Sequence, residues 1–197
     1  MHVIKLGGSL ANTAYLVDWL EVLSARANEG MVIVPGGGGF ADEVRRSQQE
    51  WKFDDRAAHR MALLAMHQYG LMNESLGTNL QAVVGAKAIP GVLTRKRVAV
   101  WLPDIAELDR AAIASDWTVT SDALSAWLAG HLRAEQLTLV KSWPQSGILA
   151  RPEDLARQGV LDSALVDIWK PTGIPLKIFH CTEWRKFAAE FDHQLAV

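Results

Sequence analysis

Short apolar runs alternate with longer segments of helical periodicity along most of the chain. Aliphatic runs occupy 2–6, 31–35, 98–102, 137–141 and 176–179, and such runs are typical of strands buried in a parallel sheet. Apolar residues three or four positions apart predict helices over 12–29, 38–50, 55–70, 121–132, 162–169 and 182–192, and a further helix is expected near 74–84. This order predicts an α/β fold, a three-layer α-β-α sandwich with a mostly parallel central sheet.

Composition narrows the class of protein. With 197 residues, 49% of them hydrophobic, residues 1–197 are expected to form a single domain. A net charge of −2 gives no general attraction for nucleic acid or a membrane surface, and no apolar run is long enough to span a bilayer. The single cysteine, Cys181, and the lack of a secretory signal predict a cytoplasmic protein with a small-molecule partner. Eight tryptophans favour a homo-oligomer, because exposed aromatic residues tend to mark interfaces.

Two glycine-rich turns follow the first two predicted strands. The first carries Gly7, Gly8 and Ser9, and the second runs from Gly36 to Gly39. Glycine lets backbone N–H groups approach an anion closely, and a helix that begins there adds a favourable field. Because neighbouring parallel strands end at the same edge of a sheet, the two turns predict a double cradle for a phosphate chain. Neither a P-loop motif nor a complete dinucleotide-binding motif is present.

Two lysines and an aspartate are placed at the same edge of the predicted sheet. Lys5 ends the first strand inside the glycine turn, where an ammonium group can meet a transferred phosphoryl group. Lys141 ends a later strand, where it can neutralise a leaving diphosphate. Thr120, Ser121 and Asp122 open the most apolar helix. Ser121 or Asp122 is expected to cap that helix, and Asp122 is also expected to point into the cleft and align the lysines.

A charged helix face follows the second glycine turn. Asp55 and His59 are four residues apart and share a face, with Arg56 and Arg60 beside them. These residues either line an acceptor pocket or form an ordinary solvated helix face. No histidine or cysteine spacing typical of a metal site occurs, and no metal-ligating residues are predicted.

The sequence resembles the amino acid kinase family in three motifs that occur in order, Lys5-Leu6-Gly7-Gly8-Ser9, Pro35-Gly36-Gly37-Gly38, and Ser121-Asp122 at the head of a helix. The resemblance covers nearly the whole chain. It implies an eight-stranded, mostly parallel sheet, with an acceptor and phosphoryl-binding part at 1–115 and a shortened nucleotide-binding part at 116–197. It also implies that ATP and Mg²⁺ are used, that Lys5 meets the phosphoryl group, and that Asp122 organises Lys5 and Lys141.

The segment after Lys141 departs from the family pattern. It keeps Gly147 and the isoleucine that follows, but Ser146 stands where the family has an acidic residue. Trp143 is therefore expected to stack on the nucleotide base in place of the usual contacts. The resemblance, together with the turns, implies phosphate and ATP binding by Gly7, Gly8, Ser9, Gly36, Gly37, Gly38, Trp143 and Gly147.

Within the family, the sequence resembles a small subgroup of similar length, namely kinases that are similar to the aminomethylfuran-methyl-phosphate kinase of methanofuran synthesis. The similarity lies in Gly39-Phe40-Ala41-Asp42 with Arg45, in 55–62, and in 117–122. It implies a phosphate-monoester acceptor, for which Arg45, Arg56 and Arg60 are available cations. The expected acceptor-binding residues are Gly39, Arg45, Asp55, His59, Arg60, Thr120 and Ser121.

Two other functions remain open from the sequence. One is a carboxylate kinase that acts on an amino acid derivative. The other is a non-catalytic nucleotide- or oxyanion-binding protein on the same fold, since the altered segment after Lys141 leaves turnover in question.

Overall fold

The computed structural model describes residues 1–142 and 151–194. Within these residues, six strands form one sheet in the order β3-β4-β2-β1-β5-β6, and every neighbouring pair is parallel. The strands are β1 (His2–Leu6), β2 (Met31–Pro35), β3 (Leu80–Val84), β4 (Val98–Leu102), β5 (Gln136–Lys141) and β6 (Leu176–His180). The predicted α/β fold with a parallel sheet is confirmed, although the described residues contain six strands where the resemblance implied eight.

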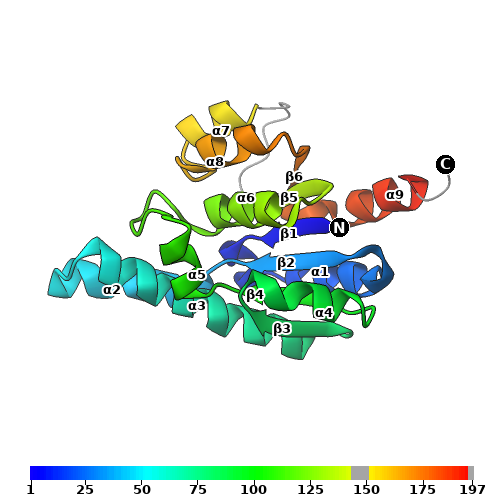
Figure 1. Ribbon diagram of the computed structural model, residues 1–197, viewed down its shortest axis with the longest axis horizontal. Helices are drawn as coiled ribbons and strands as arrows, with labels where there is room; N and C mark the ends of the chain where they lie inside the picture. The colour runs from blue at the N-terminus through cyan, green and yellow to red at the C-terminus, as the bar shows by residue number, and fades with distance from the viewer. Residues whose placement is uncertain (143–150, 195–197) are drawn as a thin grey trace.

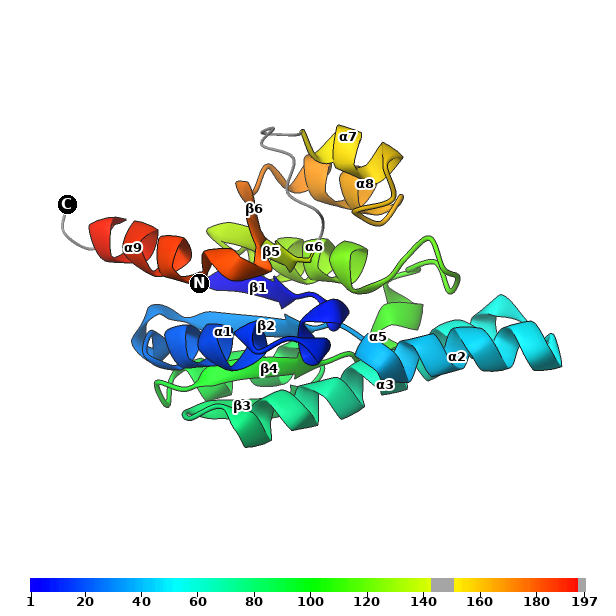
Figure 2. The same cartoon turned by 180° about the vertical axis from the view of Figure 1, so that it is seen from behind.

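Helices cover both faces of the sheet, so the chain has three layers (Figures 1 and 2). One face packs against α1 (Tyr15–Ser24), α9 (Trp184–Gln194) and the second half of α3 (Asp55–Leu76), around a core that includes Trp19 and Phe187. The other face packs against α4 (Ile89–Leu93), α6 (Ser121–Leu132) and α8 (Leu165–Trp169). Val3 and Ile4 of β1 belong to these two separate cores, because successive strand side chains point to opposite faces.

Beyond the carboxyl ends of the strands, α2 (Gly38–Trp51) and the first half of α3 project side by side away from the sheet (Figures 1 and 2). Asp54 caps α3 with its side chain, which accepts a hydrogen bond of 2.7 Å from the Ala57 amide. The short helices α5 (Ile105–Arg110) and α7 (Pro152–Arg157) complete the described elements. The projecting pair forms one wall of the space above the sheet edge.

The predicted helix near 74–84 is wrong. Helix α3 continues to Leu76, and Leu80–Val84 form the edge strand β3, paired in register with β4. Gly77, in an extended conformation, ends the helix, and Asn79 is left-handed at φ 57°, so the chain turns back into the sheet.

The predicted helix over 12–29 is also shorter than expected. Residues 15–24 are α-helical, and Gly8–Asn12 and Ala27–Glu29 are 3₁₀ turns.

Candidate active site

The two glycine turns are in direct backbone contact. A Cβ atom at Gly36 would lie 2.3 Å from the Gly8 nitrogen, and one at Gly8 would lie 2.5 Å from the Gly38 nitrogen. No residue with a side chain fits at these distances, so glycine is required for the turns to touch. The turns meet because β1 and β2 are paired in parallel and end together at Leu6 and Pro35.

The amides of the turns divide into two groups. The Gly7 amide donates to the Val140 carbonyl and the Gly36 amide donates to the Leu6 carbonyl, both at 2.9 Å, so these two hold the sheet edge together. Gly37 and Gly38 stand at the start of α2, where the first amides of a helix have no partner within it. The prediction that Gly36 contacts a ligand is not supported, because Gly36 is buried behind Gly8 and is absent from the cavity lining.

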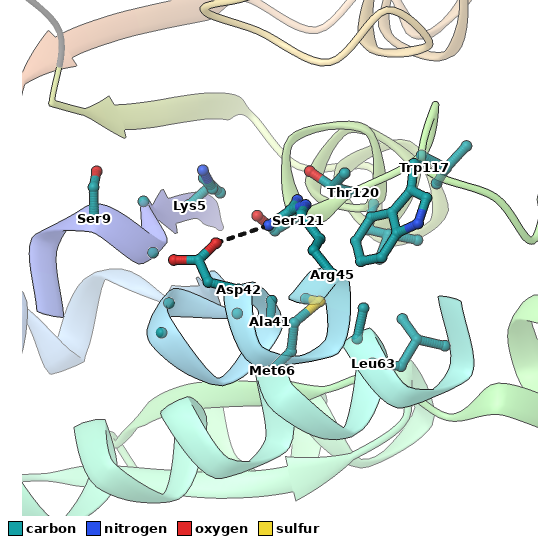
Figure 3. A pocket seen from close by; sticks show the side chains of 18 of the residues that line it. Lys5, Ser9, Ala41, Asp42, Arg45, Leu63, Met66, Trp117, Thr120 and Ser121 are labelled. Carbon is teal, nitrogen blue, oxygen red and sulfur yellow. Dashed lines mark hydrogen bonds and ion pairs between the residues drawn. The ribbon is translucent and has the colours of Figure 1, made fainter. Parts of the chain in front are cut away.

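A cavity of about 310 Å³ lies above this sheet edge. Figure 3 shows Lys5 and Ser9 on one side of the cavity and Trp117 on the other. The lining joins the glycine turns, α2, α3, the head of α6 and the end of β5. Of the residues predicted from the sequence, it contains Lys5, Gly7, Gly8, Ser9, Gly37, Gly38, Gly39, Arg45, His59, Thr120, Ser121 and Lys141.

Asp122 pairs with both lysines at once. Its Oδ1 lies 2.6 Å from the Lys5 Nζ atom, and its Oδ2 lies 2.6 Å from the Lys141 Nζ atom. The arrangement follows from the fold, because β1 and β5 are neighbouring strands and α6 begins above their ends. Lys5 and Asp122 are buried, with 3% and 1% of their surfaces exposed, and Lys141 is partly buried. The predicted alignment of the two lysines by Asp122 agrees with this geometry, but Asp122 is absent from the cavity lining, so it stands behind the lysines and does not point into the cleft as expected.

Burial and charge act in opposite directions on this cluster. Burial lowers the pKa of Lys5 below its usual value, although the nearby Asp122 carboxylate partly opposes it. Burial alone would raise the pKa of Asp122, but the charges of Lys5 and Lys141 outweigh it and the net pKa is lowered. Asp122 is therefore ionised at neutral pH, held between two cations in a site of low dielectric.

Asp162 is a residue that the sequence did not single out. Its carboxylate accepts hydrogen bonds from the Thr120 amide at 2.9 Å, the Thr120 hydroxyl at 2.7 Å and the Ala123 amide at 3.0 Å. It thus caps α6 from outside, so the prediction that Ser121 or Asp122 caps this helix is wrong. Burial, and next the Asp122 charge, raises the pKa of Asp162. No local motif marks this residue, because its partners lie about 40 positions earlier in the chain.

The far end of the cavity holds a second group of side chains. The Arg45 guanidinium lies 4.4 Å from the centroid of the Trp117 ring, and its Nη1 atom donates to Asp42 at 3.0 Å (Figure 3). Trp117 in turn donates from Nε1 to the Gln48 side chain at 2.7 Å, which ties the 111–120 segment to α2. Arg45 is therefore held at the cavity wall by a cation–π contact and an ion pair.

Several predicted acceptor residues lie elsewhere. Asp55 is exposed and accepts a hydrogen bond from Gln48 at 2.8 Å, and Arg60 pairs with Asp109 of α5 at 2.9 Å. Neither contributes to the cavity lining, nor does the exposed Arg56. The charged face of α3 is thus divided, since His59 contributes to the cavity lining, Asp55 and Arg56 are exposed, and Arg60 pairs with α5. Trp143 and Gly147 lie outside the described residues, so their predicted contacts stay predictions.

Two general observations complete the description of the site. In the parts of the chain that the structure describes, no cluster of three or more His, Cys, Asp or Glu side chains is placed to hold a metal ion. None of the described helices is both long enough and apolar enough to cross a membrane.

Comparison with known proteins places this geometry in a family. Residues 1–150 match the model of the amino acid kinase family. The chain is 27% identical over 140 residues to [5-(aminomethyl)furan-3-yl]methyl phosphate kinase of Methanocaldococcus jannaschii, an alignment that covers 71% of this chain and 64% of that relative.

Solved structures show the same fold. Uridylate kinase from Archaeoglobus fulgidus superposes with a TM-score of 0.68 at 18% identity, over 91% of this chain and 90% of that one. UMP kinase from Bacillus anthracis gives a TM-score of 0.67 at 18% identity, over 92% and 87% of the two chains. These likenesses show the fold, and the family model covers most of the sequence. The chain belongs to the amino acid kinase family.

Proposed function

We propose that this protein is a phosphotransferase that moves the γ-phosphoryl group of Mg-ATP to a small acceptor, most favourably a phosphate monoester. The observation that carries the proposal is the buried Lys5–Asp122–Lys141 cluster beside two touching glycine turns. Two cations held by one carboxylate suit a reaction in which negative charge moves from one phosphate oxygen to another.

The reaction needs no general base if the acceptor is a phosphate. An acceptor phosphate oxygen, already ionised at neutral pH, forms the new bond to the γ-phosphorus as the bond to the ADP oxygen breaks, and ADP leaves with the electron pair. Catalysis then rests on positioning and charge neutralisation. In this proposal Lys5 contacts the transferred group, Lys141 neutralises the leaving diphosphate, and Asp122 positions both lysines.

The residues present fit a nucleotide triphosphate chain. Gly8, Gly37 and Gly38 offer backbone to the cavity without side chains, and Lys5 stands beside them. Magnesium commonly binds through substrate phosphates with few protein ligands, which suits a site without a carboxylate cluster in the described residues. When bound, Mg²⁺ would supply charge neutralisation on the phosphate oxygens.

The acceptor class is supported by relatives and by one side chain. The relatives are named as kinases of an aminomethylfuran methyl phosphate and of UMP, and both of these acceptors are phosphate monoesters. Arg45 places a guanidinium in the cavity lining, where its planar fork suits phosphate oxygens. We therefore favour an acceptor such as an aminomethylfuran methyl phosphate, as in methanofuran-type cofactor synthesis.

The same proposal divides the chain into an acceptor part at 1–115 and a nucleotide part at 116–197. It also includes a cytoplasmic location and a homo-oligomer. Light scattering would test the oligomeric state.

A matched pair of arginine variants tests the acceptor class. Arg45→Ala should raise KM for a phosphate-monoester acceptor by about 10–100-fold, because a charge-assisted hydrogen bond is lost. Arg60→Ala should leave that KM within about twofold, since Arg60 is paired with Asp109 outside the cavity. Equal changes of KM in the two variants would favour the carboxylate kinase. So would turnover of amino-acid carboxylates at a rate that neither substitution changes. Tight ATP binding with no ADP release on any acceptor would favour the non-catalytic binding protein.

A further inference from the structure

The head of α6 is held by a carboxylate that comes from outside the helix. The Asp162 Oδ2 atom accepts hydrogen bonds from the Thr120 amide at 2.9 Å and from the Ala123 amide at 3.0 Å. Both carboxylate oxygens also lie close to the Thr120 hydroxyl, at 2.7 and 2.8 Å. Thr120 and Ala123 flank Ser121 and Asp122 in the sequence. One side chain therefore fixes the backbone on either side of the aspartate that pairs with both lysines.

Asp162 also contacts Asp122 through its main chain. The Asp162 amide donates a long hydrogen bond of 3.4 Å to the Asp122 Oδ2 atom, the same oxygen that lies 2.6 Å from the Lys141 Nζ atom. The other oxygen, Oδ1, faces the Lys5 Nζ atom at 2.6 Å. The carboxylate of Asp122 is thus surrounded by two ammonium groups and one backbone amide, all of which are donors to it.

The segment that carries Asp162 is fixed by its own packing. Leu161 and Leu165 are buried in the core on this face of the sheet. The Ala164 amide donates to the Thr118 carbonyl at 3.4 Å, and α8, which begins at Leu165, packs against α6. Because these contacts hold the backbone on both sides of Asp162, its carboxylate is already in position at the helix head before any ligand binds.

Capping alone does not account for this residue. Thr120 is the N-cap of α6, and threonine at that position commonly caps a helix through its own hydroxyl group. Here the hydroxyl donates to Asp162 and makes no cap of its own. Every side-chain or backbone group that Asp162 contacts with its carboxylate is a donor, which suits the ionised form.

The charge of Asp162 acts on the lysine pair. Burial lowers the pKa of Lys5, and the Asp122 charge opposes this most strongly. The Lys141 charge lowers the pKa of Lys5 further, and the Asp162 charge raises it. These three charged groups face Lys5 from α6, from β5 and from the segment before α8. When Asp162 is included, two carboxylates balance the two ammonium groups.

We propose that Asp162 is a positioning residue for phosphoryl transfer, which fixes the head of α6 so that Asp122 faces both lysines and which supplies the lysine pair with a second negative charge. The inference rests on the proposed function and deepens it. Asp162 does not contribute to the cavity lining, so it acts through Asp122 and Lys5 and not by contact with a substrate.

Asp162→Asn separates the charge from the hydrogen bonds. Its side-chain oxygen can still accept from the Thr120 and Ala123 amides, and its NH2 group can donate to the Thr120 hydroxyl, but the negative charge is lost. Asp162→Ala removes the charge and the acceptor together and is the second variant. Asp104→Asn is the matched control, because Asp104 caps α5 by accepting from the Ala106 amide at 2.9 Å, outside the cavity lining.

Titration of Lys5 in the nucleotide-free protein tests the charge without any turnover. Protein labelled with ¹³C at the lysine Cε atoms is followed by NMR as the pH rises, and Lys5→Arg identifies the Lys5 signal. The Lys5 midpoint should lie at lower pH in Asp162→Asn and Asp162→Ala than in the wild-type protein, because a charge that favours the ammonium form is gone. Asp104→Asn should keep the wild-type midpoint. A residue that only caps the helix would leave the Lys5 midpoint unchanged in every variant.

ADP release with Mg-ATP and [5-(aminomethyl)furan-3-yl]methyl phosphate measures the effect on turnover. In Asp162→Asn, kcat should fall about 10–100-fold while KM for ATP stays within about threefold, because the lysines are misplaced and the phosphate cradle is intact. A Lys5 midpoint that is unchanged in both Asp162 variants, or a wild-type kcat in Asp162→Asn, would overturn the proposal. If the wild-type protein releases no ADP, the kinase function fails, and the Lys5 titration still decides whether Asp162 acts on the lysine pair.

Discussion

Asp122 holds two lysine side chains, and the balance of charges around it explains how the site is kept in place. A buried carboxylate between two ammonium groups is stabilised by them, and Lys5 is itself held at a cost, because burial disfavours its charged form. Forming such a buried cluster adds little to the net free energy of unfolding, because the charges lose their hydration, but the cluster fixes the positions of the two ammonium groups. Removing Asp122 would leave both lysines without the carboxylate that pairs with them directly.

The first prediction concerns stability. Asp122→Ala should lower the free energy of unfolding by about 3–5 kcal/mol, because breaking a buried pair leaves uncompensated charge. Urea denaturation followed by circular dichroism measures this loss. Lys177→Ala is the control, since its pair with Glu190 is partly exposed and should contribute less than about 1 kcal/mol. A loss for Asp122→Ala no larger than for the control would contradict the account of the cluster.

A second prediction concerns pH. Lys5 must be protonated to neutralise phosphoryl charge, and its pKa is lowered by burial. The kcat/KM for ATP, which reports the free protein, should therefore decline as pH rises through a value below the usual lysine pKa. Lys5→Arg keeps a charge that does not titrate in this range, so this alkaline decline should disappear from whatever activity the variant retains. The same decline in both proteins would assign it to another group.

At the scale of elements, the touching turns after β1 and β2 set the shape of the phosphate cradle. Each turn occupies space that a single methyl group on the other would fill. The sequence predicted both turns and their adjacency, because glycine runs after apolar strands are a local signal. It did not reveal that the Gly7 and Gly36 amides bond within the sheet, since that depends on the neighbouring strand.

A third prediction tests whether the two glycine turns need glycine for their backbone contact or only for backbone flexibility. Gly8→Ala should force the turns apart, because its Cβ would lie 2.5 Å from the Gly38 nitrogen, and should lower both the melting temperature and affinity for ATP. Gly39→Ala meets no atom within 4 Å and should leave the melting temperature within about a degree or raise it slightly. Differential scanning fluorimetry distinguishes the two. A melting temperature for Gly8→Ala that equals the wild-type value would show that the turns do not need to touch.

Element boundaries were less well predicted where tertiary contacts decide them. Strand β3 lies at the sheet edge, and its residues show no clean alternation, with Val84 57% exposed. Its sequence reads equally well as the continuation of the preceding helix. The sequence places Arg60 at the acceptor, but in the structure Arg60 pairs with Asp109 outside the cavity. The pattern of the chain gives no sign of this pair, because it does not predict α5, the helix that carries Asp109.

At the scale of the whole molecule, one cavity draws residues from two stretches of the chain that lie far apart in the sequence. Its lining runs from Lys5 to Met66 and again from Trp117 to Lys141. The sequence predicted the lysines and Asp122 because each lies beside a recognisable strand end or helix start. It missed Asp162 because that contact depends on how 152–164 folds back onto α6, which no local pattern records.

A fourth prediction follows from this shared lining. A ligand that contacts both stretches should stabilise the fold as a unit, and Mg-ATP at about 100 times its Kd should add about 2.7 kcal/mol to the free energy of unfolding. The melting temperature should rise by several degrees, with a midpoint that depends on ATP concentration. A melting temperature that is insensitive to Mg-ATP would contradict nucleotide binding at this cavity.

The most direct test of the central claim is ADP release by the purified protein with Mg-ATP and [5-(aminomethyl)furan-3-yl]methyl phosphate, compared between wild type and Lys5→Ala. The account predicts acceptor-dependent ADP release that falls by about 10³-fold or more in Lys5→Ala, while circular dichroism shows an intact fold. The surface variant Lys177→Ala should retain wild-type turnover. Turnover in Lys5→Ala close to the wild-type rate, or no acceptor-dependent ADP release by a wild-type protein that binds ATP, would contradict it.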